Sequence, residues 1–237
     1  MAYKIDLHCH SWFSADGVSS PEAMVASARR KGVHGLALTD HNTCEGYFDL
    51  VDRGLARTDG QPVDGFLVIP GVEMSTAEGH LLCLGVTLPN LKGAPAAEVC
   101  RRVHVLGGLA IPAHPYDLLR AGIREAVLET LEIDALEVFN AATTFKSCNQ
   151  RALQYAQRRH LPMTAGSDAH HQAAVATAYT VLPTDDFSVR GILAQIPRGT
   201  EREEKYLTAA DALRKTMNNW FRFRKKRVRG KGSRGEG

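Results

Sequence analysis

Histidine and acidic side chains recur in short blocks along the first 170 residues of the chain, mostly where an apolar run ends. The side chains concerned are His8, His10, Asp16, His41, Glu73, His80, His114, Asp168 and His170. Imidazole and carboxylate groups together form the ligand set that proteins use for zinc, manganese and iron. One such block would mean little, but their repetition in regular order predicts a single polynuclear metal site assembled from many loops.

Two pairs of these residues are two positions apart. His8 and His10 end an apolar N-terminal run, and side chains at positions i and i+2 of a strand point to the same face. We therefore expect both imidazoles to reach one ion, with Cys9 packed on the opposite face. Asp168 and His170 have the same spacing.

Glu73 follows the apolar run 68–72, where an unpaired carboxylate would be costly to bury. It makes sense there as a ligand that bridges two ions. His80 begins the next predicted strand after a short turn, and His114 closes the apolar run 109–113.

Two aspartates lie beside the histidine blocks. Asp16 precedes Gly17, and because Asp-Gly is also an ordinary turn signal, a turn residue is the alternative to a metal ligand. Asp40 directly precedes His41 and could orient another histidine from behind the metal.

Apolar, β-rich runs alternate with helical patterns along the chain. The expected strands cover 3–9, 33–39, 66–73, 80–87, 109–113, 134–139, 161–166 and 178–182, and the expected helices cover 21–31, 94–106, 119–131 and 146–160. The runs 33–39 and 109–113 are apolar on both faces, as in parallel sheets covered by helices. This alternation predicts an α/β fold, open or closed into a barrel, with the polar blocks at the carboxyl ends of its strands, where catalytic groups gather.

The bulk composition fits one globular domain with a tail. The chain has 237 residues, 44% of them hydrophobic, and no apolar run reaches the roughly 18 residues of a membrane span. The N-terminus leads into a strand without the pattern of a signal peptide. Five irregularly spaced cysteines favour reduced thiols, so we expect a cytoplasmic protein.

The net charge of +3 is unevenly distributed. Residues 222–237 hold eight basic side chains and one acidic side chain, which gives +7 and leaves −4 for residues 1–221. We expect a hydrolase domain at 1–200 and a C-terminal helix with a basic tail at 201–237. Aromatic and basic side chains mix at 220–227, which suits single-stranded nucleic acid or an anionic membrane, although the sequence favours a terminal helix that frays into a solvated basic tail.

The blocks His8-x-His10, Asp40-His41, Glu73, His114 and Asp168-x-His170 resemble the PHP family (polymerase and histidinol phosphatase). The resemblance covers about residues 3–185. It implies a distorted seven-stranded (β/α)7 barrel with two or three divalent ions, zinc, manganese or iron.

The resemblance also implies how the ligands divide among the ions. His8, His10, Glu73 and Asp168 would bind the first ion; Glu73, His80 and His114 the second; Asp16, His41 and His170 the third. Many relatives have histidine in place of Asp16, and an aspartate there would weaken the third site or shift it toward manganese or iron. Only 33 residues separate His80 from His114, too few for the subdomain inserted there in nucleotide-cleaving relatives.

The implied activity is hydrolysis of a phosphate ester, in a small phosphomonoester, a nucleotide or an oligonucleotide, by a metal-activated hydroxide. Asp40, or Asp16 without a metal, could give a proton to the leaving group. Asn140 ends the sixth expected strand and should face the substrate, whereas Glu137 should point elsewhere unless the backbone bulges. Lys146 and Arg151 could hold phosphate, with a solvated helix face as the alternative.

Other activities also fit the sequence. The same metals could hydrolyse a carboxyl or carbamate ester, and the basic tail suits a nucleic-acid-processing enzyme. A purely structural metal site is disfavoured, because nine candidate ligands exceed the four of a closed zinc site.

Overall fold

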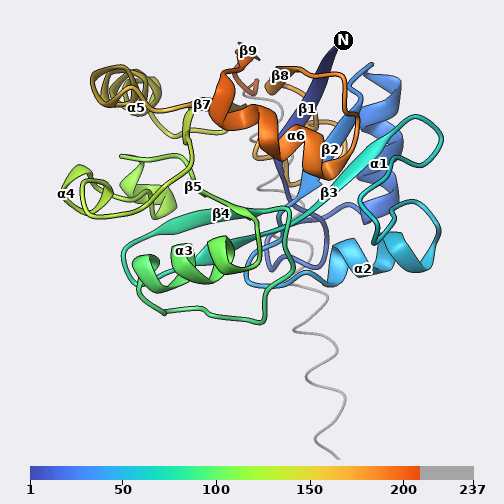
Figure 1. Cartoon of the computed structure of the whole chain (residues 1–237), viewed down its shortest axis with the longest axis horizontal. Coiled ribbons are helices and arrows are strands. Elements are labelled where there is room, and N and C mark those ends of the chain that lie inside the picture. The colour runs from blue at the N-terminus through green and yellow to red at the C-terminus, as the bar shows by residue number, and fades with distance from the viewer. Residues whose placement is uncertain (209–237) are drawn as a thin grey trace, which may run out of the picture.

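The computed structural model describes residues 1–208, which form a curled, mixed β-sheet covered by helices (Figure 1). Seven strands lie in the order β5-β4-β3-β2-β1-β8-β9, and β6 and β7 form a separate parallel pair. The strands are β1 (Ala2–Cys9), β2 (Gly35–Leu38), β3 (Leu67–Ser75), β4 (His80–Leu84), β5 (Leu109–Pro112), β6 (Leu136–Asn140), β7 (Met163–Gly166), β8 (Tyr179–Pro183) and β9 (Glu201–Glu203).

The helices lie on both flanks of this sheet. They are α1 (Pro21–Arg30), α2 (Glu45–Asp52), α3 (Ala96–Val105), α4 (Glu125–Leu128), α5 (Lys146–Arg159) and α6 (Val189–Gln195), with 3₁₀ turns η1 (Leu118–Arg120) and η2 (Ile196–Arg198). Figure 1 shows α1 and α2 on one flank and α4 and α5 on the opposite flank. Helix α1 begins as predicted, because Ser20 Oγ accepts a hydrogen bond from the Ala23 amide and Pro21 occupies the first turn.

The α/β class is confirmed, but the sheet is not all parallel. The β1–β2–β3 pairs are parallel, whereas β3–β4, β4–β5, β1–β8 and β8–β9 are antiparallel. The link from β3 to β4 is only four residues, too short for the helical crossover that a parallel pair requires. The hydrogen bonding thus gives a curled sheet beside a two-stranded pair.

The structure differs from the expected elements in three respects. The range 119–131 holds η1 and the short α4, because the chain turns back at Gly122, where a Cβ atom would lie 2.4 Å from the His114 carbonyl oxygen. Helices α2 and α6 are additional. Strand β9 pairs with β8, and the Leu207 amide donates to the Ala141 carbonyl, so the chain packs with the domain beyond residue 200. The rest of the predicted tail, 209–237, lies outside the described residues.

The fold brings the polar blocks to one edge of the sheet. Parallel strands β1, β2 and β3 end side by side, and isolated bridges join His41 to Glu73 and Cys9 to Ala169. The edge where ligands were predicted is therefore where four of the polar blocks meet. Within residues 1–208, no helix has the length and apolar character needed to cross a membrane.

All five cysteines of the chain are free and buried, and we expect them to be unreactive in the folded protein. Burial raises the pKa of the Cys9 and Cys83 thiols well above the usual range and that of Cys100 to about 12, so the reactive thiolate is scarce. In an Ellman's titration the native protein should show almost no colour within minutes, and guanidinium should release all five thiols. Rapid reaction of the native protein would contradict this packing.

Candidate metal centre

The buried carboxylate of Glu73 lies at the centre of the site, at the end of the parallel strands. Five imidazole nitrogens lie within 3.2 Å of its two oxygens. Oε2 faces His8 Nε2 at 3.2 Å, His10 Nε2 at 3.1 Å and His41 Nδ1 at 3.2 Å, and Oε1 faces His80 Nδ1 and His114 Nε2 at 2.9 Å each. Each oxygen thus faces its own group of histidines, the arrangement that a bridging ligand requires.

The donor set fits metal ions better than a hydrogen-bond network. The Nε2 atoms of His8 and His10 are 2.9 Å apart, and Asp168 Oδ1 lies 3.7 Å and 3.4 Å from them. Ring nitrogens and carboxylate oxygens that converge this closely have more acceptors than donors unless the imidazoles are protonated. A divalent cation would satisfy all of these lone pairs at once.

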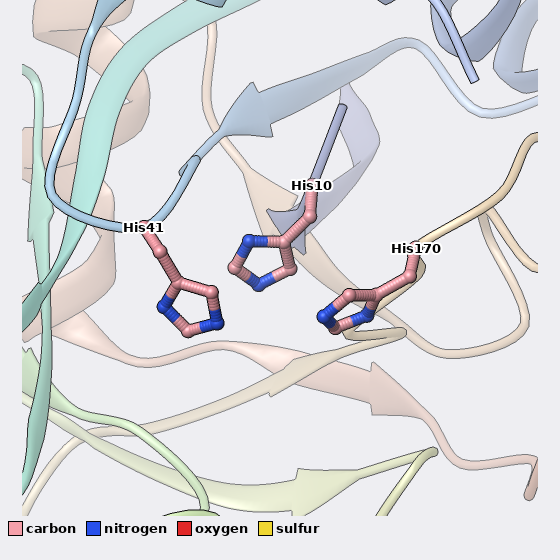
Figure 2. A group of neighbouring side chains, drawn as sticks. All are labelled: His10, His41 and His170. Atoms are coloured by element: carbon pink, nitrogen blue, oxygen red, sulfur yellow. The ribbon is translucent and has the colours of Figure 1, made fainter. Parts of the chain in front are cut away.

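A second group lies on the more open side of the site. The rings of His10, His41 and His170 come from three separate segments and lie side by side (Figure 2), with centroids 4.6 Å apart for His10–His41 and 4.4 Å apart for His10–His170. Asp16 Oδ2 lies 2.8 Å from His170 Nε2 and 3.8 Å from His41 Nε2. The structure thus brings together all nine side chains that the sequence singled out as ligands.

Strong mutual electrostatics hold this cluster together. Burial opposes ionisation of Glu73 and Asp168, but the facing histidines, and Arg120 for Asp168, keep both pKa values well below the usual range. Burial also opposes protonation of His10, yet Asp168 and Glu73 raise its pKa to about 9. For His41 burial prevails and lowers the pKa to about 3. The two ionised carboxylates, Glu73 and Asp168, therefore favour a positive charge at the centre of the site.

Glu137 also belongs to the site, although strand parity predicted otherwise. In the β6–β7 pairing, Glu137 is opposite Thr164 and Phe139 is opposite Ala165, so the strand has one extra residue and bulges. The bulge turns Glu137 inward, where Oε1 lies 2.9 Å from His8 Nδ1 and Oε2 accepts the His114 amide at 2.7 Å. Such a carboxylate fixes the tautomer of a metal-binding histidine.

Asp40 was expected to orient a histidine ring, but its side-chain hydrogen bonds go to the loop after β1. Its oxygens accept hydrogen bonds from the Ser11 amide at 2.6 Å and the Ser11 hydroxyl at 2.7 Å. In the same loop, Ser14 Oγ lies 3.2 Å from His10 Nδ1 and accepts the His41 amide at 2.7 Å. Asp40 therefore anchors the segment that carries Asp16, and Ser14, which had no signal in the sequence, connects the candidate ligands His10 and His41.

The three residues expected to bind substrate have other contacts. Asn140 Nδ2 donates to Glu137 Oε2 at 3.0 Å and to Asp168 Oδ2 at 3.1 Å. The exposed side chains of Lys146 and Arg151 lie over the rings of Tyr206 and Tyr116, at 4.5 Å and 4.4 Å from the centroids. For Lys146 and Arg151, these cation–π contacts fit the alternative of a solvated helix face better than a phosphate-binding site. Arg120, which the sequence did not suggest, contacts Asp168 instead.

Comparisons with known proteins find related sequences and a matching family model. A model of the PHP-associated family (PHP_C) matches residues 146–200. The chain is 31% identical over 148 residues to the uncharacterized protein MJ1587 of Methanocaldococcus jannaschii, covering 58% of this chain and 82% of that protein. It is 30% identical over 217 residues to a phosphoribosyl 1,2-cyclic phosphate 1,2-diphosphodiesterase of Eggerthella lenta, covering 88% and 68%.

A solved structure shows the same fold. A two-domain protein from Bacteroides vulgatus, described as containing a predicted PHP-like metal-dependent phosphoesterase, superimposes with a TM-score of 0.68 at 22% identity. The match covers 92% of this chain and 70% of the other. The curled mixed sheet and its helices are therefore shared with that protein.

We expect the Glu137→Gln variant to bind zinc or manganese about 10- to 100-fold more weakly than the wild type. In either orientation a glutamine places its NH₂ group against a donor, because Glu137 faces His8 Nδ1 on one side and the His114 amide with Asn140 Nδ2 on the other. Isothermal titration calorimetry measures the change, with the exposed Glu132→Gln as the control. Equal affinities in all three proteins would refute a role for Glu137 in holding ligands.

Proposed function

The chain belongs to the PHP superfamily, it is a hydrolase that acts on ester bonds, and we propose that it cleaves a phosphate ester at a centre of two or three divalent ions. The observation that carries this proposal is the position of Glu73 between two groups of histidines. When bound, such ions acidify a water molecule and neutralise charge on the phosphoryl oxygens.

The residues would divide among three sites as the family resemblance implies. Glu73 would be shared between the first ion, with His8, His10 and Asp168, and the second, with His80 and His114. Asp16, His41 and His170 would hold the third ion, and the 2.8 Å approach of Asp16 to His170 supports their grouping. We propose zinc, manganese or iron, since all three accept mixed imidazole and carboxylate ligands.

The geometry changes the roles that we assign to the two aspartates. Although burial opposes ionisation, His170 keeps the pKa of Asp16 well below its usual range, so Asp16 is ionised and suits a ligand rather than a proton donor. Burial raises the pKa of Asp40, but its enclosed carboxylate is held by Ser11 and could reach a leaving group only if the loop moved. We therefore propose that Asp40 acts by positioning the loop.

We expect the wild type, loaded with manganese or zinc, to release phosphate from at least one member of a panel of sugar phosphates, mononucleotides, bisphosphates and short RNAs. Asp168→Ala should reduce release to near background, because it removes a carboxylate that faces His8 and His10. Asp52→Ala, at the exposed end of α2, is the matched control and should keep full activity. Turnover of aryl acetate but of no phosphate would favour the carboxyl-ester alternative.

A second candidate function is cleavage of single-stranded nucleic acid, favoured by exposed rings beside the site. Trp12 is 47% exposed and Phe13 38% exposed in the loop that carries Asp16, and Phe145 is 58% exposed after β6. Single-strand binders stack bases on exposed aromatic rings of this kind. The basic side chains of Lys146 and Arg151 lie on the helix that follows Phe145.

If nucleic acid is the substrate, Trp12→Ala and Phe145→Ala should each raise KM for a short RNA by about 5- to 150-fold, the effect of losing one stacked base. Turnover of a small aryl phosphate should stay unchanged. Val105→Ala removes a side chain that is 80% exposed at the end of α3 and serves as the control. Identical KM values for RNA in all the proteins would exclude this function for the exposed rings.

A further inference from the structure

Arg120 lies at the edge of the metal centre and has no role in the function proposed above. It ends η1, which follows β5 and His114. Its Nη2 contacts Asp168 Oδ2, and its Nη1 donates to the Ala142 carbonyl at 2.9 Å. Only a fifth of the side chain is exposed. A cation held this firmly beside a candidate ligand needs an explanation.

The turn that carries Arg120 is tied to the next loop. Asp117 Oδ2 accepts hydrogen bonds from the Thr144 amide at 2.6 Å and the Thr143 hydroxyl at 3.1 Å, and the Asp117 carbonyl accepts the Arg120 amide at 2.9 Å. Gly122 then lets the backbone pass close to the His114 carbonyl. These contacts fix the base of the Arg120 side chain, so its guanidinium is directed at Asp168 before any ligand arrives.

The two oxygens of Asp168 have separate partners. Oδ2 forms an ion pair with the Arg120 guanidinium and accepts a hydrogen bond from the Asn140 side-chain amide at 3.1 Å. Oδ1 faces the rings of His8, His10 and His170 at 3.7, 3.4 and 3.4 Å. One oxygen is thus occupied by charged and neutral donors, and the other is directed at the ligand cluster.

We propose that Arg120, together with Asn140, is a positioning residue that restricts Asp168 to binding a divalent ion through one oxygen. An unrestrained carboxylate can bind an ion through one oxygen or both. A charge-assisted hydrogen bond to Oδ2 competes with the second mode, because breaking it would leave a guanidinium with little water. The proposal rests on the metal centre of the proposed function but not on its phosphate substrate.

A direct role in gripping phosphate is less consistent with the contacts. Arginine holds phosphate best with two parallel N–H groups. Each terminal nitrogen of Arg120 already has a partner, Asp168 for Nη2 and the Ala142 carbonyl for Nη1, and only its Nε is buried without a hydrogen-bond partner among the described residues. Asn140, which the sequence suggested as a substrate-binding residue, likewise donates hydrogen bonds from its side-chain amide to Glu137 and Asp168.

Cobalt(II) absorption tests the proposal directly, since its visible bands weaken as the coordination number rises. We expect Arg120→Gln to show weaker bands than the wild type and a Kd for the ion about 10- to 100-fold higher. Arg120→Lys should partly restore both, because an ammonium can still engage Oδ2. Arg124→Gln, an exposed arginine at the start of α4, is the control and should match the wild type.

Three other results would overturn the proposal. Unchanged spectra and Kd in both Arg120 variants, with KM for a phosphate ester raised, would make Arg120 a substrate anchor. Unchanged spectra, Kd and KM would make it a structural residue only. Failure of the wild type itself to bind cobalt, zinc or manganese would refute the metal centre and the proposed function. If Arg120→Gln does not fold, the spectrum of Arg120→Lys decides, and thermal melting of the metal-free proteins identifies that case.

Discussion

The structure depends on the burial of one carboxylate, that of Glu73, among five imidazoles. Removing such a group from water carries a large desolvation cost, which only positive charge close to both oxygens can offset. The end of β3 places Glu73 where β1 and β2 also end, so His8 and His10 at the end of β1 and His41 after β2 reach it directly. The remaining candidate ligands come from the loop after β1, from β4, from the segment after β5 and from the segment after β7.

Buried polar contacts behind the ligands hold these segments in place. Asp6, inside β1, accepts hydrogen bonds from the Ser167 amide at 3.0 Å, the Ser167 hydroxyl at 2.6 Å and the Ala176 amide at 2.7 Å, and so ties β1 to the loop that carries Asp168. Asp40 and Glu137 do the same for the loops after β1 and β5. Each of these carboxylates is almost fully buried and accepts a hydrogen bond from at least one backbone amide, and Glu137 also contacts the His8 ring.

The sequence was most informative where a signal is local. The two-residue spacing of His8 and His10 and the carboxylate after an apolar run led directly to side chains that meet in space. Glu137 was missed because the bulge that turns it inward depends on pairing between β6 and β7, strands separated by the whole of α5. Arg120 was missed because its turn was expected to be helical, and a turn that folds back on His114 has no periodic pattern. Lys146 and Arg151 were correctly placed on a helix, but packing against Tyr206 and Tyr116 decides where their charges lie.

The spread of the ligands along the chain has a consequence for folding. The ligand cluster joins residues between positions 8 and 170, so a bound ion acts as a cross-link that closes several long loops of the chain at once. Because the unfolded chain cannot present such a site, every ion bound to the native state shifts the folding equilibrium by mass action. If the proposed ions bind, the supply of metal would therefore add to the stability of the folded protein, and a chelator would act on its lifetime as well as on its chemistry.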